Sequence, residues 1–142
     1  MAKATYVDHL AEVPLFSGCS QKELRLIARI STEVDIAAGE TLMTEGHQGR
    51  EAFVIIEGTA IVRRNDRKLA EIGPGSVVGE VALLSPARRT RTATVAAATD
   101  LRALVLTPGE FSSLLREVPS ITTKLLASLA ARVGDLDRAA YG

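Results

Sequence analysis

The sequence predicts an α+β fold that is mainly β, an antiparallel sandwich or barrel with helices at both ends. Residues 1–31 and 107–141 carry apolar side chains at helical spacing, whereas residues 32–106 consist of short apolar runs separated by glycines. Many short strands at regular spacing are typical of antiparallel sandwiches and barrels. Because 142 residues suffice for one domain with its own core, we expect a single domain over residues 1–142.

The N-terminal segment predicts a helical lead-in. Apolar residues recur at helical spacing from Tyr6 to Val13, and Pro14 interrupts the pattern because proline lacks the N–H that a helix interior needs. Ser20 and Glu23 then form a capping-box pattern, in which each side chain bonds to the backbone N–H of the other residue. A second helix should therefore begin at this pair.

The central segment predicts the strands. The run Ala52-Phe53-Val54-Ile55-Ile56 is a strong strand candidate, and Val95–Leu106 completes the segment around a turn at Thr99-Asp100. Glycine favours tight turns because it has no Cβ. The apolar runs are separated by such residues, which we expect to be turns: Gly39, Gly46, Gly49, Gly58, Gly75 and Gly79.

Helix returns after residue 106. Thr107 and Glu110 form a second capping box, and Pro108 occupies the first helical position, where a missing N–H does no harm. After Pro119 an apolar stripe marks a longer helix that should end near Tyr141. Its members are Ile121, Leu125, Leu129, Val133 and Leu136.

Composition narrows the function classes. Lys plus Arg and Asp plus Glu both number 17, so no polybasic field points to nucleic acid. The single Cys19 cannot form an internal disulfide, which fits a reducing cytosol. The first residues lack the apolar core of a signal peptide, and no apolar run is long enough to cross a bilayer. We expect a cytoplasmic protein with no membrane contact.

The ligand chemistry is concentrated between Gly73 and Val95. Glycines let a ligand approach the backbone, and free amides at the start of a short helical turn attract an anion. Glu80 is a lone carboxylate that can accept hydrogen bonds from sugar hydroxyls, and Arg91 offers a planar fork that matches phosphate oxygens. Phosphate and sugar together suggest a nucleotide.

This stretch resembles a known motif. Gly79-Glu80-Val81-Ala82-Leu83, followed by Arg91-Thr92-Ala93-Thr94-Val95, is similar to the phosphate-binding cassette of cyclic nucleotide-binding domains. The resemblance runs from about Phe16 to Glu117, and the glycines fall where that family has its turns. It implies an antiparallel jelly-roll β-barrel (32–106) between N-terminal helices and a C-terminal helix pair (107–141), with a short cassette helix.

The resemblance also assigns roles. Arg91 would pair with the exocyclic phosphate oxygens, Glu80 would accept from the ribose 2′-hydroxyl, and backbone amides would complete the phosphate cradle. Thr92 leaves cyclic GMP possible beside cyclic AMP, because a hydroxyl here can touch a guanine amino group in relatives. The implied ligand-binding set is Gly79, Glu80, Val81, Ala82, Arg91, Thr92 and Ala93.

One departure from the family leaves the anchor open. The arginine lies nine or ten positions after the glutamate in typical members, but Glu80 and Arg91 are eleven positions apart. Arg89-Thr90 also mimics the motif, so Arg89 is the alternative anchor. We prefer Arg91 because Ala93-Thr94-Val95 follows it as the closing strand follows the arginine in the family.

Two other function classes compete with a sensor. A cupin-like enzyme needs clustered imidazoles, but the only histidines are His9 and His47, so we expect no metal, no cofactor and no catalysis. A DNA-binding regulator would carry its recognition helix after Tyr141, so we expect no nucleic-acid contact from this chain alone. The chain would then be a stand-alone sensor or the sensor fragment of a larger regulator, such as a transcription factor.

The expected function is therefore a non-enzymatic sensor for a cyclic nucleotide, with cyclic AMP as the first candidate ligand. Occupancy would be relayed through the C-terminal helices to an effector protein or to a second subunit. The alternative is a structural module that kept the fold and binds no ligand.

Overall fold

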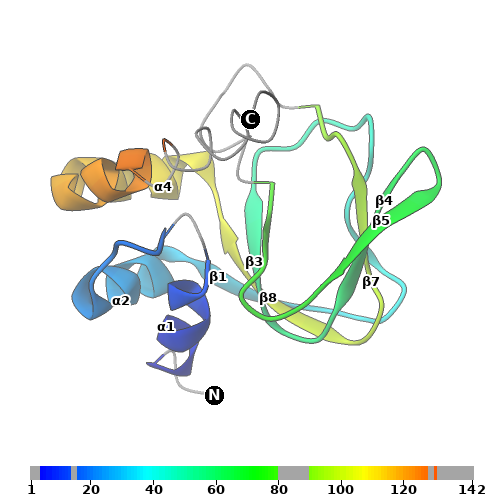
Figure 1. Cartoon of the computed structure of the whole chain (residues 1–142), viewed down its shortest axis with the longest axis horizontal. Helices are drawn as coiled ribbons and strands as arrows, with labels where there is room; N and C mark the ends of the chain where they lie inside the picture. Colours follow the sequence, from blue (N-terminus) through cyan, green and yellow to red (C-terminus); the bar gives the residue numbers. More distant parts are fainter. Residues whose placement is uncertain (1–3, 14–15, 80–89, 128–129, 131–142) are drawn as a thin grey trace, which may run out of the picture.

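Two antiparallel sheets form the centre of the protein (Figure 1), in a computed structural model that describes residues 4–13, 16–79, 90–127 and 130. We call one the inner sheet, with strand order β1 (Thr32–Ile36), β8 (Leu101–Leu106), β3 (Ala52–Glu57) and β6 (Val77–Val78). The outer sheet has the order β2 (Thr41–Met43), β7 (Thr94–Ala97), β4 (Ala60–Arg64) and β5 (Arg67–Ile72). The predicted antiparallel jelly roll is confirmed, and its two sheets form a sandwich.

The helices lie on one side of the inner sheet. They are α1 (Ala4–Ala11), α2 (Gln21–Ile30) and α4 (Pro108–Glu117), and residues 119–127 continue as a further helical segment. Figure 1 shows α1, α2 and α4 on one face of β1, β3 and β8, with β4, β5 and β7 on the opposite side. The molecule therefore has three layers, namely helices, inner sheet and outer sheet.

Side chains of the inner sheet point alternately into two apolar cores. Val54 and Ile56 of β3 pack with the helices, whereas Ile55 packs with residues of the outer sheet. Along β8, Leu104 and Leu106 face the helices, and Ala103 faces the outer sheet. Successive residues of a strand point to opposite faces, so a strand buried on both faces needs an unbroken apolar run. This explains the apolar runs at residues 52–56 of β3 and 103–106 of β8.

Both predicted capping boxes are present. At the start of α2, the Glu23 backbone N–H donates to Ser20 Oγ at 3.2 Å, and the Ser20 backbone N–H donates to Glu23 Oε1 at 2.7 Å. At the start of α4, Thr107 and Glu110 make the same reciprocal pair, with Pro108 at the first helical position. These pairs satisfy backbone N–H groups that the first turn of a helix leaves without partners.

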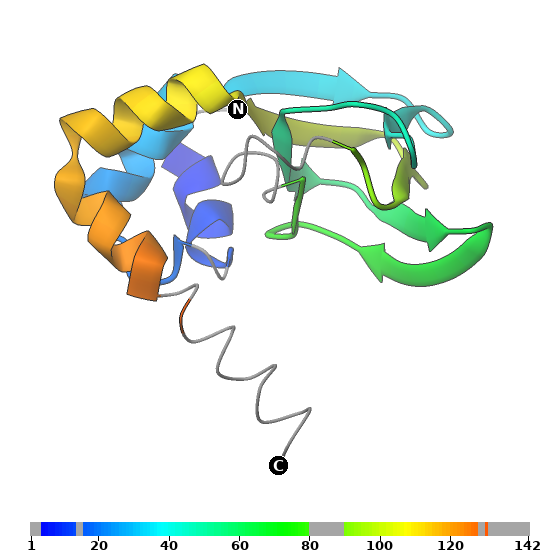
Figure 2. The ribbon, with the colours of Figure 1, turned by 90° about the horizontal axis from the view of Figure 1, so that it is seen from above.

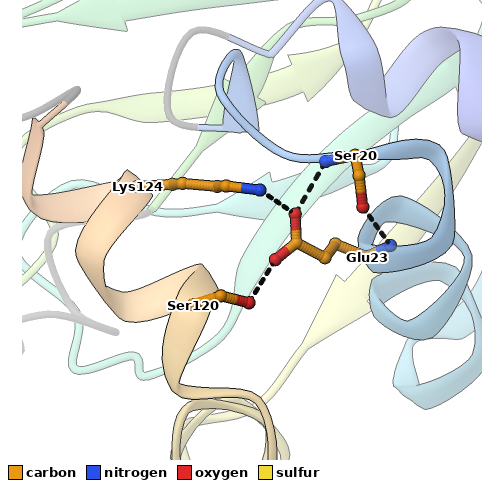
Figure 3. Close-up of polar contacts among 4 residues, drawn as sticks. All are labelled: Ser20, Glu23, Ser120 and Lys124. Atoms are coloured by element: carbon orange, nitrogen blue, oxygen red, sulfur yellow. Dashed lines mark hydrogen bonds and ion pairs between the residues drawn. The ribbon is translucent and has the colours of Figure 1, made fainter.

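The C-terminal helical segment is held against α2 by one carboxylate (Figure 3). Ser120 Oγ donates to Glu23 Oε2 at 2.5 Å, and Lys124 Nζ donates to Glu23 Oε1. The hydrogen bond from Lys124, together with those from Ser120 and Ser20, lowers the pKa of Glu23 to about 2. Figure 2 shows these C-terminal helical residues alongside the N-terminal helices. Ile121 and Leu125 of the predicted stripe are buried in this layer, and its other members lie outside the described residues.

Candidate functional site

The backbone of Arg91 is fixed by the loop between β2 and β3. The Arg91 N–H donates to the carbonyl of His47 at 2.8 Å, and the Gly46 N–H donates to the carbonyl of Arg91 at 2.9 Å. Beside this pair, Gln48 Nε2 donates to Thr90 Oγ1 at 3.0 Å. Arg91 therefore has a defined position between this loop and the start of β7.

The side chain of Arg91 passes through a cradle made by two glycines. A Cβ atom added at Gly49 would lie 2.2 Å from Arg91 Nε, and one added at Gly79 would lie 2.8 Å from Nη1. Gly79 also has a φ of +83°, which side chains other than glycine rarely adopt. Larger residues at either position would displace the guanidinium.

The guanidinium itself is buried. Arg91 is 7% exposed, and its Nη2 donates to the backbone carbonyl of Glu51 at 2.8 Å. The Glu51 carboxylate lies 3.6 Å from the same nitrogen, and its side chain is 47% exposed. Burial lowers the pKa of Arg91, and the charge of Glu51 opposes part of that shift. An arginine keeps its charge in proteins, so the site contains a positive charge that is largely shielded from water.

The segment that carries Arg91 is also attached to the outer sheet. Arg64 Nε donates to the carbonyl of Thr92 at 2.9 Å, and the Glu45 N–H donates to Thr94 Oγ1 at 3.0 Å. Ala93 is buried, whereas the side chain of Thr92 is exposed. Contacts on both sides therefore hold this segment in place.

Four of the seven predicted ligand residues lie within the described part of the chain. Gly79 and Arg91 are brought into contact, and Thr92 and Ala93 follow Arg91 directly. The other three, Glu80, Val81 and Ala82, lie outside the described residues. The alternative anchor Arg89 lies outside them as well.

Sequence reasoning missed Glu51 and the role of Gly49. The sequence marked Gly49 as a turn residue, but nothing in it pairs that turn with an arginine much later in the chain. Glu51 precedes a strongly apolar strand and is 40 residues from Arg91. A solitary carboxylate before a strand gives no signal for such a partner, so only the folded chain reveals the pair.

An acidic hollow lies at the opposite end of β3. Two of its carboxylates have partners within the protein, because Asp100 accepts a hydrogen bond from the Ala38 N–H at 3.0 Å and Asp35 accepts one from Arg102 at 2.9 Å. Within the described ranges, no group of three or more His, Cys, Asp or Glu side chains could hold a metal ion. The described helices also include none that is long and apolar enough to cross a membrane. Arg91 therefore remains the main candidate site.

Comparisons with known proteins point to the same chemistry. The sequence profile described as "Cyclic nucleotide-binding domain" matches residues 33–118. The chain is 33% identical over 129 residues to a cAMP-dependent protein kinase regulatory subunit of Mycosarcoma maydis, with 84% of this chain and 24% of that protein covered. The chain spans between 19% and 59% of the length of eight curated relatives that it matches.

Solved structures agree with this similarity. The N-terminal domain of a transcriptional regulator from Streptomyces coelicolor superposes with a TM-score of 0.85 at 31% identity, covering 93% of this chain and 94% of that one. The catabolite activator protein of Thermus thermophilus superposes with a TM-score of 0.75 at 28% identity, covering 87% of this chain and 60% of that one.

Proposed function

The chain belongs to the cyclic nucleotide-binding domain family, and we propose that it is a non-enzymatic receptor for a cyclic nucleotide, with cyclic AMP as the first candidate. The observation that carries this proposal is the buried guanidinium of Arg91 in its cradle of two glycines. Burying a charge is unfavourable unless a partner compensates it. Among the described residues, Arg91 has one ion-pair partner, the carboxylate of Glu51, which is half exposed and beyond hydrogen-bond distance, so an anionic ligand fits the site.

Arg91 is the proposed anchor of the cyclic phosphate. Its hydrogen bond to the Glu51 carbonyl uses one of the five N–H donors of a guanidinium, which supports a second role toward phosphate oxygens. Gly79 and Ala93 are small, so a ligand could approach the backbone there. The family resemblance supports Glu80 as the acceptor from the ribose 2′-hydroxyl, and Val81 and Ala82 as sources of backbone donors.

The base preference follows from weaker observations. The relative from Mycosarcoma maydis is named for cAMP, which supports cyclic AMP as the ligand of this chain. The exposed hydroxyl of Thr92 keeps cyclic GMP as a second candidate. The two nucleotides differ only in the base, so a direct comparison of their affinities separates the candidates.

The proposed output of the receptor is a change in its C-terminal helices. Ligand binding would shift the population of helix positions after Thr107, and so change what residues 120–138 present to an effector protein or a second subunit. The packing of α4 and residues 119–127 on the layer that contacts β3 supports this route. The chain would act in this way alone or as the sensor part of a larger regulator.

The direct test is calorimetric titration of cyclic AMP and cyclic GMP into the wild type, Arg91→Ala and Arg89→Ala. We expect Arg91→Ala to weaken binding by at least about 10-fold, because a charge-assisted hydrogen bond contributes about 1.5–3 kcal/mol. Arg89→Ala is the matched control and should bind as the wild type does. Loss of binding only in Arg89→Ala would move the phosphate anchor to that residue. If the wild type shows no heat of binding and no thermal stabilisation with either nucleotide, the ligand-independent module is favoured.

A further inference from the structure

Glu51 contacts Arg91 in two different ways. Its backbone carbonyl accepts a hydrogen bond from Arg91 Nη2 at 2.8 Å, and its carboxylate Oε2 lies 3.6 Å from the same nitrogen. The Arg91 side chain is 6% exposed and that of Glu51 is 47% exposed. The carbonyl therefore belongs to the buried cradle, whereas the carboxylate lies at its edge in contact with water.

The carbonyl and the glycine cradle position the guanidinium without help from the carboxylate. A separation of 3.6 Å exceeds the range of an N–H···O hydrogen bond, so the carboxylate acts on Arg91 through its charge. Gly49 and Gly79 confine the guanidinium sterically, and the carbonyl bond fixes its orientation. A neutral side chain at position 51 should therefore leave Arg91 in place.

The charge of Glu51 matters for any anion that Arg91 binds. Together, one guanidinium and one carboxylate have no net charge, so the site attracts a phosphate less strongly than Arg91 would alone. Coulomb energy is proportional to the product of the charges. A cyclic phosphodiester carries one negative charge, whereas a phosphomonoester carries close to two at pH 8, because its second pKa is about 6. Glu51 repels the monoester about twice as strongly.

We propose that Glu51 is a specificity-determining residue that discriminates against the dianionic nucleoside 5′-monophosphate in favour of the monoanionic cyclic nucleotide. This inference rests on the proposed function, because it assumes that Arg91 receives the phosphate. Hydrolysis of one P–O bond of the cyclic ester adds water and yields the monoester. Glu51 therefore helps the receptor distinguish its ligand from the product of ring opening.

The test is titration of cyclic AMP and 5′-AMP into the wild type and Glu51→Gln at pH 8 and low salt. Two unit charges about 6 Å apart in water-like surroundings correspond to about a 3-fold change in a binding constant. We expect Glu51→Gln to bind cyclic AMP about 3-fold more tightly and 5′-AMP about 9-fold more tightly, because the effect is squared for a dianion. The preference for the cyclic ligand should narrow about 3-fold, and added salt should reduce the change.

Glu57→Gln is the matched control. Glu57 lies at the other end of β3, its side chain is 46% exposed, and its Oε1 lies 3.7 Å from Arg102 Nη1. It therefore reproduces the chemistry of Glu51 beside a different arginine, about 20 Å away along the strand. This variant should keep both wild-type affinities. Glu51→Asp retains the charge and should keep the wild-type preference.

The outcomes separate this inference from the proposed function. If the wild type binds no cyclic nucleotide, the proposed function fails first. If the wild type binds cyclic AMP and Glu51→Gln binds it more weakly, the carboxylate positions Arg91 and the inference is wrong. An unchanged ratio of the two affinities in Glu51→Gln, whether both ligands bind more tightly or neither does, would also overturn the inference. Thermal denaturation of each variant shows that the comparison is made between folded proteins.

Discussion

At the scale of single residues, the candidate site depends on the absence of side chains as much as on Arg91. The Arg91 guanidinium occupies the space where a Cβ of residue 49 would lie. The φ of Gly49 does not lie in the left-handed region, so its backbone conformation is open to other residues. Glycine is therefore needed at position 49 only because its lack of a side chain leaves space for the Arg91 guanidinium.

Gly49→Ala should reduce cyclic nucleotide affinity by about 10-fold or more, because a displaced guanidinium loses a charge-assisted hydrogen bond worth about 1.5–3 kcal/mol. The midpoint of thermal unfolding should change little, since the new methyl group meets the end of a long side chain. Gly109→Ala is the control, because in the described part of the chain no atom lies within 4 Å of a Cβ built there, apart from its chain neighbours and the backbone of its own helix. Wild-type affinity in Gly49→Ala would show that Arg91 is not held as described.

At the scale of elements, Glu23 links two helices that are far apart in sequence. The same carboxylate completes the capping box of α2 and accepts from Ser120 and Lys124 on the C-terminal helical segment (Figure 3). Glu23 is 6% exposed, so loss of its charge would leave Lys124 without this partner at the junction. The N-terminal helices are therefore part of the mechanism that holds the C-terminal segment.

Glu23→Gln should lower the free energy of unfolding by about 1–3 kcal/mol at pH 7, because it removes hydrogen bonds to a charged group. The pKa of Glu23 is lowered from 4.5 to about 2 on folding. A lowered carboxyl pKa contributes stability that is complete above pH 4.5 and is lost as the pH falls toward about 2. The stability difference between wild type and variant should therefore shrink over this interval in denaturant titrations.

Glu110→Gln is the control for that prediction. Glu110 occupies the equivalent position in the capping box of α4, where, within the described residues, its carboxylate and backbone N–H bond to Thr107. This variant tests the loss of a capping carboxylate without the loss of a cross-helix link. A destabilisation equal to that of Glu23→Gln would mean that the bonds to Ser120 and Lys124 contribute nothing measurable.

At the scale of the whole molecule, the inner sheet connects the candidate site to the helices. Glu51, which accepts from Arg91, is followed directly by β3, and Val54 and Ile56 of β3 pack in the helical core. The turn before β6 is also in contact with the N-terminal helical region, since a Cβ at Gly75 would lie 2.9 Å from Glu12 Cβ. A ligand at Arg91 would therefore be connected to the helices through the packed side chains of β3.

Saturating cyclic AMP should change the rate of amide hydrogen exchange in residues 121–127, because we propose that ligand binding shifts the position of these helices. Exchange measured by mass spectrometry can compare this segment with β5, an edge strand on the outer sheet, where we expect no comparable change. Exchange in residues 121–127 that is the same with and without saturating nucleotide would refute the proposed relay.

The features that the sequence alone determined are those whose physical cause is local. Both capping boxes pair residues three positions apart, so their pattern is complete within one helical turn. The apolar run at residues 52–56 and the short apolar runs within Val95–Leu106 predicted strands without knowledge of their neighbours, and the glycine and arginine motifs led to the correct family.

Other features could not be predicted before folding, because they depend on residues that are distant in sequence. Glu51 and Arg91 are 40 residues apart, and Glu23 and Lys124 are 101 residues apart. A charged residue has many possible partners in an extended chain, and only packing of the sheets and helices selects one. The sequence therefore determined the elements and the type of chemistry, whereas folding decided which carboxylate faces the Arg91 site and which carboxylate holds the C-terminal helix.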